Sequence, residues 1–310
     1  MQKIHTSELS TQTVQTTEKE ITTVSKIRDY AAFIKLRLAT LVVFSAVISY
    51  LIGSKESANF EWAKLLWLML GGFLVTGSSN GFNQIIERDL DKLMTRTANR
   101  PLPQQRMSLM EAMLLAVVTG IAGIFILSFF VNPLSGILGM LALILYTVVY
   151  TPLKRKTPFA VFVGAFPGAI PPLLGYVAST QGFGEITFHG WLLFFTQFLW
   201  QFPHFWAIAW VMDDDNKKAG FHMLPSAGGR DKSSAFQTLV YTLFLIPVSL
   251  STVFFKLSGP YSAIVILLCG IIFAWQSYKL YKENTVESAR KLMFGSFIYL
   301  PIVQLAVLLG

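Results

Sequence analysis

The stretch LMEAMLLAVVTGIAGIFILSFFV, residues 109–131, decides the fold class, because Glu111 is its only charged side chain. A helix needs about 20 apolar residues to cross the hydrocarbon core of a bilayer. No water is available there, so the backbone amides and carbonyls must bond to one another within the helix. We therefore expect residues 109–131 to form a transmembrane helix.

Further stretches of similar length and composition lie on both sides of it. They are 34–53, 62–83, 134–151, 159–179, 190–212, 236–255, 260–280 and 290–309. The chain of 310 residues is 53% hydrophobic and only 14% charged, against about 25% charged in soluble domains, which excludes two water-soluble domains. The sequence predicts an all-α polytopic membrane protein. We expect residues 30–310 to form a single bundle of nine transmembrane helices and residues 1–29 to form a disordered polar tail in the cytoplasm.

The basic residues lie almost entirely on one side of this predicted bundle. The chain has 25 Lys and Arg residues, and all except Lys55, Lys64 and Lys256 fall in the tail or in alternate connections between spans. Cytoplasmic loops of membrane proteins carry such an excess of basic residues. We therefore expect a cytoplasmic amino terminus and an external carboxyl terminus. The asymmetry accounts for the net charge of +8, so we expect a lipid bilayer and no nucleic acid as a partner.

An acidic segment follows the second predicted span, in NGFNQIIERDLDKLMTRTANRPLP, residues 80–103. On a helix, Asn83, Glu87 and Asp91 are spaced so that all three lie on one face. Carboxylate and amide oxygens are ligands that Mg²⁺ prefers, commonly together with substrate phosphates. The alternative is a solvated helix end, in which the two carboxylates pair with the basic residues Arg88, Lys92 or Arg96.

A second acidic segment ends the sixth predicted span, in WQFPHFWAIAWVMDDDNKKAGFHMLP, residues 200–225. Three consecutive aspartates at a helix carboxyl end repel one another and oppose the helix dipole, so a compensating cation is expected. On a continuous helix, Asp215 would share a stripe with His204. The alternative is that Lys217 and Lys218 simply neutralise the aspartates.

Two carboxylate clusters on one membrane face, joined by basic loops, are what binding a diphosphate through Mg²⁺ requires. Arg96 and Arg100 flank the first cluster, and Lys154 and Arg155 lie on the short loop after the fourth span. We expect these four side chains to bind phosphate oxygens, although the positive charge of cytoplasmic loops alone is enough to place them there.

Four motifs together resemble the UbiA-type intramembrane prenyltransferases. They are N-x-x-x-(D/E)-x-x-x-D after the second span, RTANRPLP (96–103), YTPLKR (150–155) and WQFPHFWAIAW with its following aspartates and GFHMLP. The resemblance covers residues from about 30 to 310. The stretches FPHFWA and RTANRPLP are most similar to the branch of this family that farnesylates haem.

The resemblance implies a bundle of nine helices with a lateral opening to lipid and a Mg²⁺-dependent prenyl transfer. The donor would be farnesyl diphosphate and the acceptor the 2-vinyl group of haem B, giving haem O for terminal oxidases. Haem A synthase or the assembly of a terminal oxidase would then be a partner. The implied ligands of Mg²⁺ and the diphosphate are Asn83, Glu87, Asp91, Asp214 and Asp215. Basic residues Arg96, Arg100, Lys154 and Arg155, with Tyr150, would bind the substrate.

The acceptor would need apolar walls, because haem is a large flat ring. Phe202, Phe205, Trp206 and Trp210 are candidates, with plain packing as the alternative. An ionisable side chain within a membrane span is a candidate functional residue, so His204 is expected to contact haem iron, a propionate or the diphosphate, unless it is a hydrogen-bonded core histidine.

Prolines occur at three positions of the fifth predicted span, Pro167, Pro171 and Pro172. Proline kinks a helix, so this span is either a kinked wall beside a bulky substrate or a helix whose small residues allow close packing.

Other functions remain open at this point. Another UbiA-type enzyme would prenylate a quinone precursor or a chlorophyll-type acceptor. A transporter would use His204 and the acidic residues as an ion path, and a non-catalytic oxidase assembly factor is a third alternative. We expect a bacterial plasma membrane, with the active site on its cytoplasmic face.

Overall fold

The computed structural model describes residues 23–310, in which every regular element is a helix and no β-strand occurs. The elements in chain order are α1 (Thr23–Phe33), α2 (Leu36–Ser57), α3 (Trp62–Asp91), α4 (Leu109–Ile126), the π-helical η1 (Leu127–Val131), α5 (Pro133–Ile144), the π-helical η2 (Leu145–Tyr150), α6 (Thr151–Leu153), α7 (Ala160–Ala178), α8 (Phe188–Val211), α9 (Asp213–Lys218), α10 (Lys232–Phe254), α11 (Pro260–Glu283) and α12 (Val286–Leu309).

Eight helical segments among the described residues are long and apolar enough to cross a membrane. They are Leu36–Ser57, Trp62–Asp91, Leu109–Val131, Pro133–Leu153, Ala160–Ala178, Lys232–Phe254, Pro260–Glu283 and Val286–Leu309. The prediction of an all-α, multi-pass membrane protein is confirmed. The remaining predicted span, the sixth at 190–212, corresponds to α8, which has 24 residues but carries Gln197, Gln201 and His204 in its apolar sequence. Nine crossings therefore stay a prediction.

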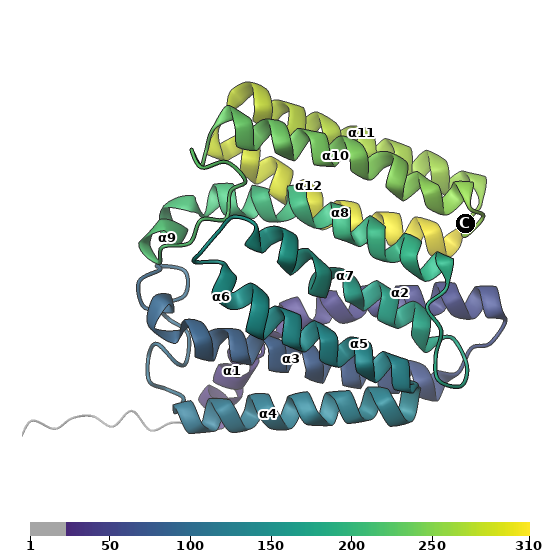
Figure 1. The fold of residues 1–310 in the computed structure, drawn as a ribbon, viewed down its shortest axis with the longest axis horizontal. Helices are drawn as coiled ribbons and strands as arrows, with labels where there is room; N and C mark the ends of the chain where they lie inside the picture. The colour runs from purple at the N-terminus through teal and green to yellow at the C-terminus, as the bar shows by residue number, and fades with distance from the viewer. Residues whose placement is uncertain (1–22) are drawn as a thin grey trace, which may run out of the picture.

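The long helices run side by side in one bundle (Figure 1). The segments α6 and α9 lie at one end of the bundle, and the carboxyl terminus lies at the other. Helix α7 is the most enclosed of the eight spans, with 72% of it buried, whereas 22% of Leu109–Val131 is buried. The bundle is therefore built around α7, and α4 presents most of its surface to the surroundings.

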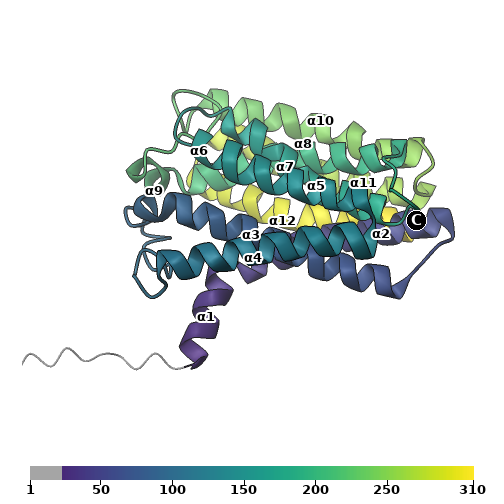
Figure 2. The same ribbon diagram turned by 60° about the horizontal axis from the view of Figure 1, so that its bottom comes forward.

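Helix α1 projects from the side of the bundle (Figure 2). The predicted tail, 1–29, falls mainly outside the described residues, but its last residues, from Thr23 on, are helical. Arg106 holds α1 to the segment after α3 through an ion pair with Asp29, at 3.0 Å.

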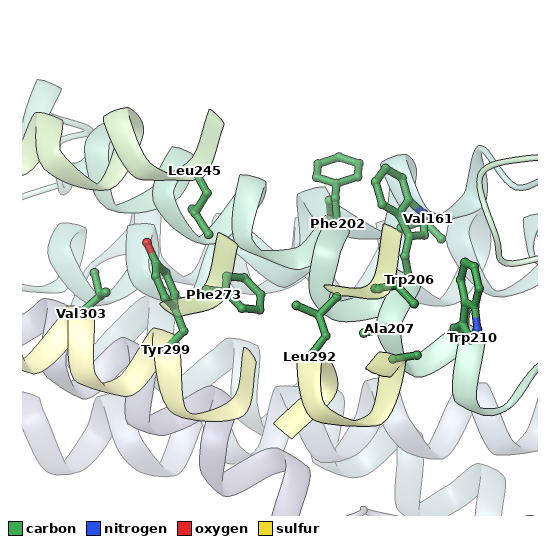
Figure 3. Packing of buried hydrophobic residues seen from close by; sticks show 14 of the residues in the cluster. Val161, Phe202, Trp206, Ala207, Trp210, Leu245, Phe273, Leu292, Tyr299 and Val303 are labelled. Carbon is green, nitrogen blue, oxygen red and sulfur yellow. The ribbon is translucent and has the colours of Figure 1, made fainter. Parts of the chain in front are cut away.

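The largest core cluster joins α8 to the three carboxyl-terminal helices (Figure 3). Phe202, Trp206 and Trp210 of α8 are 2%, 5% and 0% exposed. Leu292 of α12 and Phe273 of α11 belong to the same cluster. Lipid is as apolar as these side chains, so helices inside a bilayer are held together by close van der Waals packing. The aromatic residues of α8 supply such packing and mainly stabilise the bundle.

The prolines of α7 are accommodated within a continuous helix, Ala160–Ala178. Pro172 has no N–H with which to bond the carbonyl of Gly168, four residues earlier. Gln197 Nε2 of α8 donates to that carbonyl instead, at 2.7 Å. A neighbouring helix thus satisfies the freed backbone group, as the membrane interior requires.

Helices α2 and α7 approach each other closely at Gly175. A Cβ atom on Gly175 would lie 2.0 Å from the carbonyl oxygen of Ala46. Only glycine permits this approach, which supports the alternative that small residues of α7 serve close packing.

Candidate active site

A cavity lies at the end of the bundle where α3 ends and α9 begins. Its lining comes from α3, the segment after it, η2, α8 and α9, together with single residues from the connections. The lining residues are Lys35, Asn83, Glu87, Asp91, Met94, Arg96, Arg100, Tyr146, Tyr150, Lys154, Phe205, Ile208, Ala209, Met212, Asn216, Phe221 and Met223.

One face of α3 supplies the acidic side of the cavity. Asn83, Glu87 and Asp91 all line it and are 2%, 4% and 0% exposed. Helix α3 is unbroken through Asp91, so residues four apart lie on the same face. The prediction that these three side chains share one face is confirmed, and the alternative of a solvated helix end is wrong.

Basic residues from other segments hold the two carboxylates. Arg100 Nη1 lies 2.7 Å from Asp91 Oδ2, and Lys154 forms an ion pair with Glu87. Arg88, near the end of α3, and Lys92, directly after it, pair with the exposed Asp89 instead. The cavity therefore brings together residues from α3, the segment after it and the connection after α6.

Lys35 adds a cation that the sequence analysis did not single out. It lies between α1 and α2, and its Nζ donates to Asn83 Oδ1 at 3.0 Å. Burial, together with the positive charges of Arg100 and Lys154, lowers the pKa of Lys35 to about 7. The sequence signal was a lysine directly before an apolar span, which topology alone also explains.

Positive charge exceeds negative charge in the cavity lining. Four basic side chains line it, Lys35, Arg96, Arg100 and Lys154, and the acidic ones are Glu87 and Asp91. Burial lowers the pKa of Arg96, and the nearby Arg100 lowers it further; a guanidinium nevertheless stays charged. Crowded cations in a confined space favour binding of a multiply charged anion.

One buried oxygen of Asp91 is left without a partner. Oδ2 bonds to Arg100, but Oδ1 has no hydrogen-bond partner among the described residues. An unsatisfied buried acceptor costs about 1–3 kcal/mol, so this oxygen is available to a cation.

The donor set fits a magnesium ion that shares its ligands with a substrate. Within residues 23–310 no three His, Cys, Asp or Glu side chains come close enough to bind a metal by themselves. Mg²⁺ commonly takes one or two carboxylates and fills its other positions with phosphate oxygens and water. Glu87 and Asp91, with the amide of Asn83, meet that requirement.

The second acidic segment does not continue the sixth span. The prediction that Asp215 lies on one continuous helix with His204 is wrong. Helix α8 ends at Val211, and Met212, with φ −100° and ψ 10°, separates it from α9. Asp215 therefore does not continue the stripe of His204.

Each of these aspartates has partners within the protein. Asp215 accepts hydrogen bonds from the backbone amides of Thr95 at 2.8 Å and Arg96 at 3.1 Å, and it pairs with Lys218 at 3.0 Å. The exposed Asp214 pairs with Arg230 at 2.9 Å. Neither aspartate lines the cavity, so their role as Mg²⁺ ligands stays a prediction.

The remaining predicted site residues divide into two groups. Tyr150 lines the cavity, and its ring lies 5.3 Å from that of Tyr146, a second lining residue that the sequence analysis missed. Arg155 is exposed and lies outside the lining. Trp206 packs in the core, 5.0 Å from the ring of Tyr241. His204 is buried beside the cavity and is bonded to α12.

Comparison with known proteins identifies relatives over most of the chain. The sequence profile of the UbiA prenyltransferase family matches residues 42–298. A protein named protoheme IX farnesyltransferase from Cytophaga hutchinsonii is 46% identical, over 92% of this chain and 98% of that protein. One of the same name from Christiangramia forsetii is 45% identical, over 92% of this chain and 94% of that protein.

Solved structures share the fold. A chain from a study of digeranylgeranylglyceryl phosphate synthase has a TM-score of 0.75 at 23% identity, covering 92% of this chain and 98% of that one. A UbiA homologue from Archaeoglobus fulgidus, bound to GPP and Mg²⁺, has a TM-score of 0.67 at 15% identity, covering 91% and 100%. At such identities the likeness shows the fold alone.

Proposed function

The chain belongs to the UbiA prenyltransferase family, and from that membership we propose that it farnesylates haem B. In this reaction the farnesyl group of farnesyl diphosphate is transferred to the 2-vinyl group of the haem. The products are haem O and diphosphate, and the haem O serves haem–copper terminal oxidases. The proposal of haem as acceptor is supported by relatives up to 46% identical that are named protoheme IX farnesyltransferase.

The observation that carries the proposal is the surplus of positive charge around an unpartnered buried carboxylate oxygen. Lys35, Arg96, Arg100 and Lys154 line the cavity and are placed to bind diphosphate oxygens. In a site for an anion alone, the carboxylate of Asp91, whose Oδ1 lacks a partner, would repel the ligand. A diphosphate bound together with a divalent cation uses both features.

We propose that Asn83, Glu87 and Asp91 hold Mg²⁺. A UbiA homologue with the same fold has been solved with GPP and Mg²⁺ bound. Bound there, Mg²⁺ supplies charge stabilisation to the departing diphosphate. The basic side chains bind the phosphate oxygens and neutralise the charge that develops when the C–O bond breaks. Tyr146, Tyr150 and Phe205 line the same cavity and exclude water from the allylic carbon.

The reaction is balanced without an oxidant or reductant. The C1–O bond of farnesyl diphosphate breaks, and the electron pair leaves with the diphosphate. The vinyl group of haem B supplies the electron pair of the new C–C bond. Water adds to the resulting cation beside the porphyrin ring and loses one proton, which gives the hydroxyethylfarnesyl group of haem O.

The proposed orientation places this cavity on the cytoplasmic side of a bacterial plasma membrane. The end of the bundle that carries the cavity also carries the basic connections, and such connections are retained in the cytoplasm.

The test is incubation of the purified protein with haem B, farnesyl diphosphate and Mg²⁺, followed by mass spectrometry. We expect haem O to form, and to be lost when the metal is removed by a chelator. Prenylation of 4-hydroxybenzoate or a naphthoate with no haem product would overturn the proposal in favour of a quinone-type enzyme.

A further inference from the structure

His204 presents one ring nitrogen with no partner, in a position fixed by three aromatic neighbours. The residue is 8% exposed. Its ring is stacked on that of Trp200, with centroids 4.2 Å apart at 17°. Phe297 meets it edge-on at 5.0 Å, and Phe205 does so at 5.4 Å.

The hydrogen bonds around Ser296 decide which nitrogen of His204 carries the proton. Ser296 Oγ donates its single hydrogen to the carbonyl of Met293, at 2.6 Å. The same Oγ lies 2.7 Å from His204 Nδ1 and has no second hydrogen to give. Nδ1 must therefore be the donor in that bond, and in the neutral ring Nε2 is left with a free lone pair.

That lone pair is not used within the protein. No hydrogen bond to His204 Nε2 exists among the described residues. The opposite arrangement occurs at His189, where Nδ1 contacts Glu56 at 2.6 Å and Nε2 contacts the carbonyl of Phe255 at 3.1 Å. A buried acceptor without a hydrogen-bond partner costs free energy, so packing alone does not explain the unpaired Nε2 of His204.

A histidine with Nδ1–H bonded to an oxygen and Nε2 free is the arrangement typical of a metal ligand. Trp200 reinforces the orientation, because its Nε1 donates to the backbone carbonyl of Ser296 at 3.0 Å. Ser296 thus fixes both the imidazole and the ring stacked on it.

The position of His204 suits an acceptor that reaches the cavity from the side. The next residue, Phe205, and Ile208, one helical turn further on, both line the cavity. His204 itself does not line the cavity, but one turn of helix is only about 5.4 Å, a distance that a wide porphyrin ring held at Nε2 can span.

We propose that His204 Nε2 binds the iron of the haem acceptor and so positions its vinyl group for prenyl transfer. The inference rests on the proposed function, because it takes haem as the substrate. Nε2 donates its lone pair to iron, and no proton or electron is transferred, because Nδ1 keeps its hydrogen. Trp200 and Ser296 are positioning residues that act through the imidazole.

The test compares two porphyrins that differ only in the metal. The full chain in detergent is titrated with ferric haem B and with metal-free protoporphyrin IX, and the absorption spectrum of the bound haem reports the iron ligand. His204→Ala is expected to weaken binding of haem B by about tenfold or more and to change its spectrum, while the affinity for protoporphyrin IX is unchanged. Imidazole added to His204→Gly should restore the spectrum.

Two further variants keep the test decisive. His189→Ala is the matched control and should leave both affinities and the spectrum unchanged. Ser296→Ala retains the imidazole but removes its hydrogen-bond partner, so it should weaken only haem binding, even if His204→Ala does not fold.

The outcomes separate the two proposals. If His204→Ala leaves the haem spectrum unchanged, or weakens both porphyrins equally, iron ligation is wrong and the proposed function stands. If the unaltered protein binds neither porphyrin, haem is not its acceptor and both proposals fail.

Discussion

Asp91 is the residue at which the charge balance of the cavity can be tested most directly. Its side chain is fully buried, with one oxygen bonded to Arg100 and the other without a partner. Asp91→Asn keeps the size of the side chain but removes its charge, so we expect haem O formation to fall by about 100-fold or more. Product formation and thermal unfolding would be measured together.

The control for this substitution lies two residues away. Asp89 is on the same helix, but its side chain is 66% exposed and it pairs with Lys92. Asp89→Asn should retain nearly normal turnover. Similar activities in the two variants would mean that Asp91 holds neither the metal nor the diphosphate.

Lys35 tests the proposed role of the surplus positive charge. Loss of one charged hydrogen bond to the ligand costs about 1.5–3 kcal/mol, so Lys35→Met should weaken binding of inorganic diphosphate about tenfold or more. The unliganded protein should not lose stability, because the substitution removes a cation crowded by Arg100 and Lys154. Isothermal titration calorimetry and thermal unfolding measure the two effects.

The exposed Arg37, two residues further on, provides the comparison for Lys35. Arg37→Met should leave diphosphate binding unchanged. A loss of stability in Lys35→Met with unchanged binding would identify Lys35 as a structural residue only.

Asp91 and Lys35 also show how much of the cavity could be predicted from the sequence. The shared face of Asn83, Glu87 and Asp91 was predictable, because helical periodicity is local. The contact of Lys35 with Asn83 joins positions 48 apart in the chain, and no local pattern contains such a contact. The spacing could therefore identify the acidic side of the cavity but only part of its basic side.

At the scale of elements, Asp215 connects α9 to the segment that follows α3. Burial alone would raise the pKa of its carboxyl, but hydrogen bonds from the Arg96 amide, Lys218 and the Thr95 amide outweigh burial and hold the pKa well below its usual value of 3.8. A depressed pKa means that this carboxylate stabilises the fold above about pH 3.8 and that the stabilisation is lost as the pH falls through the folded-state value.

Asp215→Asn should therefore lower the unfolding temperature at pH 7, through a loss of about 2 kcal/mol. The difference from the unaltered protein should shrink as the pH is lowered below 3.8. The neighbouring Asp214, whose side chain is 81% exposed, is the control, because Asp214→Asn should have little effect at any pH. A difference for Asp215→Asn that does not depend on pH would contradict the assignment of the effect to its charge.

The break between α8 and α9 could not be predicted from the local sequence. Neither proline nor glycine occurs near Met212, where the helix ends. The break accompanies the contact of Asp215 with the amides of Thr95 and Arg96, about 120 positions away in the chain. The spans themselves were predictable, because the length of an apolar stretch is a local property.

The contact between α2 and α7 depends on the absence of a side chain at Gly175. A Cβ there would lie 2.0 Å from the carbonyl oxygen of Ala46, so Gly175→Ala should destabilise the protein by about 1–3 kcal/mol. At Gly72 of α3 the nearest atom would be a methyl group of Val43 at 3.7 Å. Gly72→Ala should instead be neutral or stabilise by about 0.5–1 kcal/mol. Thermal unfolding in detergent would decide, and equal effects of the two substitutions would contradict the close approach.

At the scale of the whole molecule, the number of crossings depends on α8. Eight segments qualify as spans by length and composition, and α8 lies among them in the bundle (Figure 1). The polar side chains that lower its hydropathy are bonded inside the protein. Gln197 and Gln201 donate to carbonyls of α7, and His204 bonds to α12. Polar groups satisfied in this way do not prevent a helix from crossing.

The orientation of the two ends tests whether α8 crosses. With nine crossings the termini lie on opposite sides of the membrane, and with eight they lie on the same side. Alkaline phosphatase fused after Gly310 should therefore be active, and a green fluorescent protein fused there should stay dark. The same reporters inserted after Gly220, between α9 and α10, should give the reverse result, because the basic connections are expected in the cytoplasm. If α8 does not cross, both results are exchanged, because the three spans α10, α11 and α12 separate the two positions in either case. Phosphatase activity after Gly220, with fluorescence after Gly310, would show that the prediction of nine crossings is wrong.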